Sequence, residues 1–519
     1  MAAILKSRWI LILWIIAFVM LKLPALHYSF FWDESWSYAP GVKLMYNHGP
    51  SLMPNAIDLY YSRGHPMLFY ATAAAWMHIF GPSLISQHSF ALFISVLLLI
   101  SVYEISLRLF NKRAAMLSLL LVTGQIIFFV QSTTLLPEVM VTLFALLTLY
   151  FYTTQKYWQT FLTCTALVFT KESGMTLGLV LGLHATFYLF NKTATAKQKI
   201  KNLLPVLCSG LCIGGFYLLQ KKVNGWYLFP EHTGLIDYSW AMFNGKMRYC
   251  AEIVFQLQFR NWLFFLLSAA GIAAAIKTRN YRFALPLLTG LLLYIFTGSH
   301  FGYITRRLYI PFLFISLLHT FYALVKLDED ATYQSKLFIF LSLFFFGTYM
   351  SFCAMNFLSV RYLLCGIVVI MLLVSWCLEL FASQIQNVFI YVVADCIIIF
   401  AFSFKLNTGI GDTELAMHAA IAVQQDIAQY LENNKLYTKN ITAKSALQRI
   451  HLTEPMTGFR HTSDSFTAVN YTLSPATDFI IKDNIEIDST DLSNKAPEGF
   501  KQVYSSVHGE AWGTIYGRK

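Results

Sequence analysis

Residues 9–38 read WILILWIIAFVMLKLPALHYSFFWDESWSY, an apolar segment followed by two adjacent acids, Asp33 and Glu34. The apolar part, Trp9 to Leu26, is long enough to cross a bilayer as a helix, which takes about 20 residues. A charge beside hydrocarbon is costly unless it is solvated or paired, so acids at this boundary are candidates for function. The alternative interpretation is a solvated loop acid.

The composition indicates a membrane protein. Of 519 residues, 57% are hydrophobic and only 13% are charged, against about 25% charged residues in soluble domains. The net charge of +11 comes from Lys and Arg in short loops, so we expect membrane lipids and no nucleic acid as partners. The eight cysteines are scattered singly, which indicates neither a zinc site nor a disulfide framework. No small-residue cleavage site follows the first apolar run, so we interpret it as a retained span.

Apolar runs of membrane-spanning length recur up to about residue 404 and predict a mostly α, polytopic protein with about 13 transmembrane helices. The predicted spans are 9–26, 84–109, 114–131, 139–153, 159–170, 175–190, 202–220, 261–276, 283–297, 308–325, 337–352, 362–382 and 388–404.

The loop charges predict the orientation of these spans. With the N-terminus in the cytoplasm, every strongly basic short loop falls on the cytoplasmic side, as the positive-inside rule requires. The opposite face then collects the long loops, and loops on a scaffold commonly carry function. We therefore predict a transmembrane domain over 1–404 with catalytic outer loops at 27–83, 132–138, 170–174 and 221–260.

The composition changes after residue 404 and predicts a small extracytoplasmic α/β domain over 405–519. Asp412-Thr-Glu414 can cap a helix that runs to about Glu432. Alternating apolar residues then predict strands at 440–446, 466–470, 478–482, 500–506 and 512–517. We expect this domain to have a structural or acceptor-related role.

The order of short motifs resembles the GT-C superfamily of membrane glycosyltransferases, and in particular bacterial relatives of protein O-mannosyltransferases and of the aminoarabinose (lipid A) transferase. The motifs that carry the resemblance are Asp33-Glu34, His65-Pro66, Pro137-Glu138, Thr170-Lys-Glu-Ser-Gly174, Phe229-Pro-Glu-His232, Arg306-Arg-Leu-Tyr309 and Arg361-Tyr-Leu-Leu364. The chain lacks the large central-loop domain of the eukaryotic enzymes. It also reads Arg63-Gly-His-Pro-Met67 where the aminoarabinose transferases carry an acid and Lys-Pro-Pro.

The resemblance implies a catalytic role for Asp33 as the base that accepts the acceptor's proton. Glu34 would position Asp33 or a cationic partner. For the donor phosphate, the resemblance implies Lys171, which is basic on the outer side, and an Arg-Tyr element. Arg361 and the pair Arg306 and Arg307 are alternatives for that element.

Other residues of the outer loops are candidates for substrate contacts: Tyr38, His65, Glu138 and Glu231. His65 and His232, with an acid from another loop, are also candidate ligands of a divalent metal ion. The alternatives are a hydrogen-bonding loop histidine and, for Glu138, an acid that favours a helix start.

Together, the motifs favour a transferase of the bacterial inner membrane. It would move a sugar from a polyprenyl-phosphate donor to a glycan, lipid or protein acceptor on the outer face by a single, inverting displacement. The main alternative is a transporter or flippase of a lipid-linked sugar. The sequences of such proteins tend to show repeated halves and polar residues near the span centres. A structural subunit of an envelope complex would not need this set of outer acids and bases.

Overall fold

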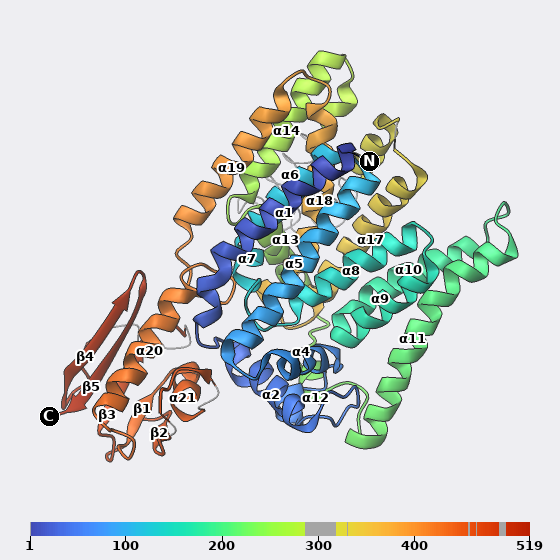
Figure 1. The fold of residues 1–519 in the computed structure, drawn as a ribbon. Coiled ribbons are helices and arrows are strands. Elements are labelled where there is room, and N and C mark those ends of the chain that lie inside the picture. The colour runs from blue at the N-terminus through green and yellow to red at the C-terminus, as the bar shows by residue number, and fades with distance from the viewer. Residues whose placement is uncertain (1, 286–317, 330, 455–456, 463, 487–494) are drawn as a thin grey trace.

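The computed structural model describes residues 2–285, 318–329, 331–454, 457–462, 464–486 and 495–519. A bundle of long helices carries a small α/β domain at one end, where the short helices of the first loop also lie (Figure 1). The bundle helices are α1 (Ala2–Lys22), α5 (Leu84–Leu109), α6 (Lys112–Thr123), α7 (Ile126–Gln131), α8 (Glu138–Thr153), α9 (Tyr157–Thr170), α10 (Met175–Leu189), α11 (Ala196–Asn224), α13 (Trp240–Phe255), α14 (Arg260–Thr278), α17 (Tyr333–Met355), α18 (Leu364–Ala382) and α19 (Val388–Leu406).

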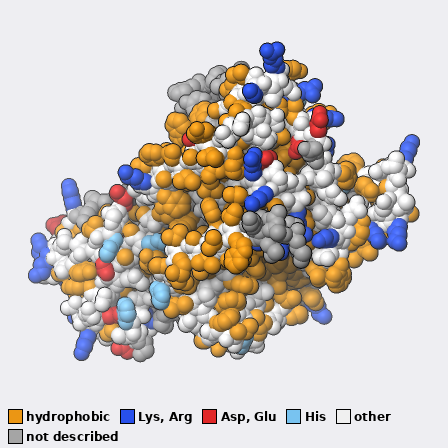
Figure 2. Space-filling view, turned by 45° about the horizontal axis from the view of Figure 1, so that its top comes forward, with side chains coloured by type: hydrophobic (Ala, Val, Ile, Leu, Met, Phe, Trp, Pro, Cys, Tyr) orange, Lys and Arg blue, Asp and Glu red, His pale blue; other side chains and the backbone are white. Residues whose placement is uncertain are grey.

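Seven helical segments among the described residues are long and apolar enough to span a membrane, and the fold is that of a polytopic helical membrane protein. They are Arg8–His27, Leu84–Leu109, Ala196–Asn224, Arg260–Thr278, Tyr333–Met355, Val360–Ala382 and Val388–Leu406. Figure 2 shows hydrophobic side chains spread broadly over the helical part of one face. Exposed apolar residues such as Trp9, Leu13 and Leu21 on α1 suit contact with lipid.

Several predicted spans differ from these helices in length. The spans at 139–153, 159–170 and 175–190 are helices of 16, 14 and 15 residues. The span at 114–131 is split into α6 and α7 at Gly124, where a Cβ atom would lie 2.4 Å from the ring of Phe400. The spans at 283–297 and 308–325 lie mostly outside the described residues, so the total of thirteen stays a prediction.

Helix α18 forms the centre of the bundle. All of its residues are buried, and it packs against α6, α8, α14 and α17. It is joined to α6 by a hydrogen bond of 2.6 Å between the hydroxyls of Ser375 and Ser118. Because Arg361 lies in the turn that leads into α18, this rigid helix fixes the position of that guanidinium.

The C-terminal domain confirms all five predicted strands: β1 (Ile441–Ala443), β2 (Val469–Asn470), β3 (Phe479–Asp483), β4 (Phe500–His508) and β5 (Ala511–Arg518). The sheet order is β2-β1-β3-β5-β4, with parallel pairing on both sides of β1 and antiparallel pairing from β3 onward. Helix α20 (Met417–Asn433) covers β4 and β5, and α21 (Ala446–Thr453) was not predicted.

The predicted helix cap in this domain is wrong. Helix α20 begins at Met417. The residue at the capping position is Ala416, whose side chain makes no hydrogen bond to the helix. Asp412 instead lies five residues before Met417 and contacts Arg361 of the helical domain. The short segment between α19 and α20 therefore reaches back to the bundle.

The C-terminal domain packs on the chain just before Asp33. Phe31 is fully buried in the same hydrophobic cluster as Ile421 and Phe459. The amide of Phe30 donates to the carbonyl of Thr457 at 3.0 Å, and Gln425 Nε2 donates to Ser29 Oγ at 2.8 Å. This domain thus supports the long loop between α1 and α5 as well as its own core.

Candidate active site

Asp33 lies at the start of a tight turn that sets its direction. Trp32 adopts a left-handed backbone conformation with φ of 50°, and residues Glu34–Tyr38 then form one π-helical turn. The indole Nε1 of Trp36 donates a hydrogen bond to Asp33 Oδ1 at 3.0 Å. The Asp33 side chain remains 27% exposed, so this carboxylate is both oriented and accessible.

Arg361 is the hub of the site. Its Nη2 donates to Asp33 Oδ2, and its Nη1 donates to Asp412 Oδ2 of the C-terminal domain. Its Nε lies 3.6 Å from Glu138 Oε1 without forming a hydrogen bond. The side chain is only 7% exposed. One guanidinium therefore contacts carboxylates from the first loop, the second loop and the C-terminal domain.

Lys171 provides the second cation. Its Nζ donates to Glu138 Oε1 at 2.8 Å and lies 4.1 Å from the centre of the Tyr362 ring. Burial alone would lower the pKa of Lys171, but its interactions with Glu138, Tyr362 and Glu172 together outweigh burial and raise the pKa. Glu138, the first residue of α8, thus holds the two cations on one side of the site.

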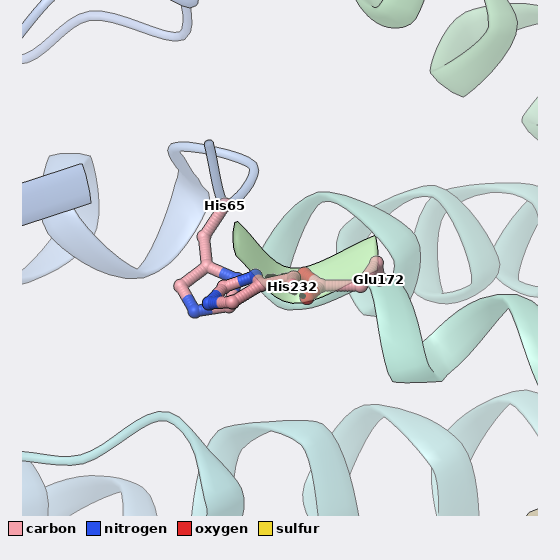
Figure 3. Close-up of side chains that lie close together, drawn as sticks. All are labelled: His65, Glu172 and His232. Carbon is pink, nitrogen blue, oxygen red and sulfur yellow. Dashed lines mark hydrogen bonds and ion pairs between the residues drawn. The ribbon is translucent and has the colours of Figure 1, made fainter. Parts of the chain in front are cut away.

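A second cluster consists of His65, Glu172 and His232, which come from three different loops (Figure 3). His65 Nδ1 lies 2.8 Å from Glu172 Oε2, and His232 Nδ1 lies 4.0 Å from Glu172 Oε1. Gly64, with φ of 69°, lets the loop of Trp226 pass close to His65, since a Cβ atom there would lie 2.7 Å from the indole ring.

The electrostatics of this cluster favour an ionised glutamate beside a neutral histidine. Burial opposes ionisation of Glu172, but the charge and hydrogen bond of His65 and the charge of Lys171 lower its pKa to about 2. Burial, with smaller contributions from His65 and Lys171, lowers the pKa of His232 to about 4. His232 is therefore neutral at pH 7 and can offer a nitrogen lone pair.

One pocket joins the histidine cluster to Lys171 and Glu138, while Asp33, Arg361 and Asp412 are not among its lining residues. It is lined by His65, Glu138, Lys171, Glu172, His232 and Tyr362, with Tyr349, Phe352 and Phe357 among its apolar lining. The lining has the character of a ligand site, with a few convergent polar groups among apolar side chains.

Other predicted residues lie outside this pocket lining. Glu34 is buried and accepts hydrogen bonds from His88 Nε2, at 2.9 Å, and from the backbone amide of Leu135. Tyr38 is buried and stacks on His65 and Tyr70. Glu231 is largely exposed and pairs with Arg63 at 3.6 Å. Arg306 and Arg307 lie outside the described residues.

Sequence reasoning missed three residues of the site. Glu172 stands in the quoted motif at 170–174, but only its neighbour Lys171 received a role. Tyr362 contacts both cations, with Arg361 5.2 Å from its ring centre. Asp412 gave no usable signal, because its local sequence resembles a helix cap and its partner lies 51 residues earlier.

The comparisons with known proteins point to a family. Residues 64–219 match the family model described as dolichyl-phosphate-mannose-protein mannosyltransferase. The match covers less than half of the chain and shows that this segment is similar to that family. The matched segment contains His65, Glu138, Lys171 and Glu172. No curated protein sequence matches the chain.

Similar solved structures include two of ArnT from Cupriavidus metallidurans, each 12% identical to this chain. The apo structure has a TM-score of 0.41 and covers 97% of both chains. The structure bound to undecaprenyl phosphate has a TM-score of 0.42 and covers 98% of both chains.

Proposed function

We propose that this GT-C transferase moves a sugar from a polyprenyl-phosphate donor to an acceptor hydroxyl at the outer membrane surface. Asp33 accepts the proton of the attacking hydroxyl, which displaces the lipid phosphate from the anomeric carbon in one inverting step. The matched family is named for a donor of this class, dolichyl-phosphate-mannose. We further propose that the protein lies in a bacterial inner membrane with its N-terminus in the cytoplasm.

The observation that carries the proposal is the placement of an accessible carboxylate beside two buried cations. The side chains of Glu138 and Asp412 are 4% and 13% exposed, against 27% for Asp33. Asp33 is therefore the carboxylate of this group that an incoming acceptor reaches most easily. Lys171 and Arg361 lie on the side of Glu138 and offer charge-assisted hydrogen bonds to a departing phosphate.

A divalent cation fits the second cluster and the charge of the whole site. Among the described residues, the permanent cations beside Asp33, Glu138, Glu172 and Asp412 are Lys171 and Arg361, so the described part of the site has a deficit of positive charge for an anionic donor. His65, His232 and Glu172 provide nitrogen and carboxylate ligand atoms that all lie within 4.8 Å of one another. We propose that these three residues bind a divalent metal ion, which would supply positive charge near the donor phosphate.

The proposed activity is tested in proteoliposomes with a panel of radiolabelled polyprenyl-phosphate sugars and crude envelope acceptors. We expect release of the polyprenyl phosphate and transfer of the label to the acceptor fraction. Movement of intact donor across the bilayer without cleavage would contradict the transferase and favour a transporter of lipid-linked sugar.

A further inference from the structure

The segment between α19 and α20 places a carboxylate on the cation to which we assign the donor phosphate. Asp412 Oδ2 accepts a hydrogen bond from Nη1 of Arg361, while Nη2 of the same guanidinium is bound to Asp33. A phosphate oxygen would need the same kind of charge-assisted contact as this carboxylate. Asp412 thus lies where an anionic ligand of Arg361 would bind.

Arg361 has little free capacity for a further anion. Two of its nitrogens are taken by Asp33 and Asp412, and its buried Nε has no hydrogen-bond partner among the described residues but lies 3.6 Å from Glu138. A donor phosphate that arrives with all three carboxylates in place would meet a net negative environment. One carboxylate therefore has to move away from the Arg361 guanidinium before Arg361 can bind phosphate.

Asp412 is the carboxylate that can most easily move away from Arg361. Glu138 is held at 2.8 Å by Lys171 at the start of α8, and Asp33 is held by Trp36 on its π-helical turn. Asp412 belongs instead to an irregular segment, and the described contacts of its carboxylate are with Arg361. Burial raises the pKa of Asp412, and contact with Arg361 offsets this only in part, so the charge of Asp412 is incompletely compensated.

We propose that Asp412 is a resident anion of the donor site, which the phosphate of the polyprenyl donor replaces on Arg361. This inference rests on the proposed function of the same site. In the empty enzyme, Asp412 neutralises Arg361 and keeps the guanidinium directed at Asp33. When the donor binds, its phosphate takes Nη1 and Asp33 keeps Nη2, so the proposed base stays oriented.

This exchange makes the C-terminal domain a participant in donor binding. The backbone carbonyl of Asp412 is held by Gln131 Nε2 at 2.8 Å, so the main chain can stay anchored while the side chain turns away. Asp412 is a positioning residue in this account, because it acts on the donor through Arg361.

The test is the binding of undecaprenyl phosphate to the full-length protein in nanodiscs, measured for wild type and Asp412→Asn. Removal of the competing charge is expected to lower the Kd by about tenfold, the scale of one charge-assisted contact. Asp412→Glu keeps the charge and should bind as weakly as wild type. Asp426→Asn is the matched control, since Asp426 pairs with Ser506 and His508 within the C-terminal domain.

The outcomes separate this inference from the proposed function. If wild type binds undecaprenyl phosphate and Asp412→Asn binds it equally or more weakly, with an unchanged melting temperature, the exchange is wrong. If Asp412→Asn melts early, Asp412→Ser provides a second test with a smaller neutral side chain. If neither wild type nor any variant binds the lipid phosphate, both the donor assignment and the exchange fail.

Discussion

The two clusters of the site differ in how far their charged groups are already paired with groups of opposite charge. In the cation cluster of Lys171 and Arg361, each cation contacts at least one carboxylate, so anions enter only by exchange. In the histidine cluster of His65, Glu172 and His232, a single acid faces two imidazoles, one of which is neutral at pH 7. The first arrangement suits a phosphate and the second suits a metal cation. The comparison indicates that neighbouring parts of one site bind different groups, a phosphate in the cation cluster and a metal ion in the histidine cluster.

The largest effect is expected from Asp33→Asn, which removes the proposed base and leaves the cations in place. Loss of a general base typically costs about 10²–10⁴-fold in rate. The rate of sugar transfer from the donor should therefore fall by at least about 100-fold. Binding of undecaprenyl phosphate should remain. Asp237→Asn, at a partly exposed aspartate in the segment between α12 and α13, is the control and should retain full activity. Near-normal turnover of a well-folded Asp33→Asn variant would remove Asp33 from the mechanism.

Removal of the proposed metal ion by a chelator tests the histidine cluster independently of the cation cluster. Treatment with EDTA should lower transfer by about 100-fold or more, because a bound divalent cation is worth several kcal/mol at a phosphate. Added Mn²⁺ or Zn²⁺ should restore activity in wild type but not in the double variant His65→Asn/His232→Asn. Full activity of wild type after exhaustive chelation would show that the histidine cluster works without a metal.

Arg361→Lys tests the contribution of the cation cluster to donor binding. Lysine keeps the charge but loses the fork that reaches Asp33 and Asp412 together. We expect the KM for the donor to rise by about tenfold, the value of one lost charge-assisted hydrogen bond. Lys222→Arg, at a lysine at the end of α11, is the control. An unchanged KM would move the phosphate site to the other candidate, Arg306 and Arg307.

The smallest effect concerns stability against acid. The pKa of His232 is lowered from about 6.5 in the unfolded chain to about 4 in the folded one, so the unfolded state binds more protons between these values. Stability is therefore fully present above pH 6.5 and falls as the pH drops from 6.5 toward 4. Melting temperatures of the metal-free protein should show this decline, and His232→Asn should reduce its slope. An equal slope in the variant would assign the decline to other groups.

Much of the fold could be predicted from the sequence, because each element carries its own periodicity. The run at 84–109 matches α5 at both ends, and alternating apolar residues mark the five strands of the C-terminal domain, although the helix α21 between β1 and β2 was missed. The split at Gly124 was missed, and the close contact of Gly124 with Phe400, which is remote in sequence, is not visible in the local pattern.

The site was predictable only where a residue is unusual in its own surroundings. Asp33, Lys171 and Arg361 are charges at span boundaries on the predicted outer side, and the structure brings all three to one place. Glu34 is adjacent to Asp33 in sequence, but the π-helical turn directs it to His88 instead. Asp412 could not be found this way, since its role depends on how two domains meet.

The most direct test of this account is an experimental structure of the full-length protein with undecaprenyl phosphate and Mn²⁺. We predict the phosphate within hydrogen-bonding distance of Lys171 and Arg361. We also predict the anomalous signal of manganese between His65, Glu172 and His232. A phosphate bound near the middle of the spans, away from Asp33, would contradict the account and favour transport of the lipid.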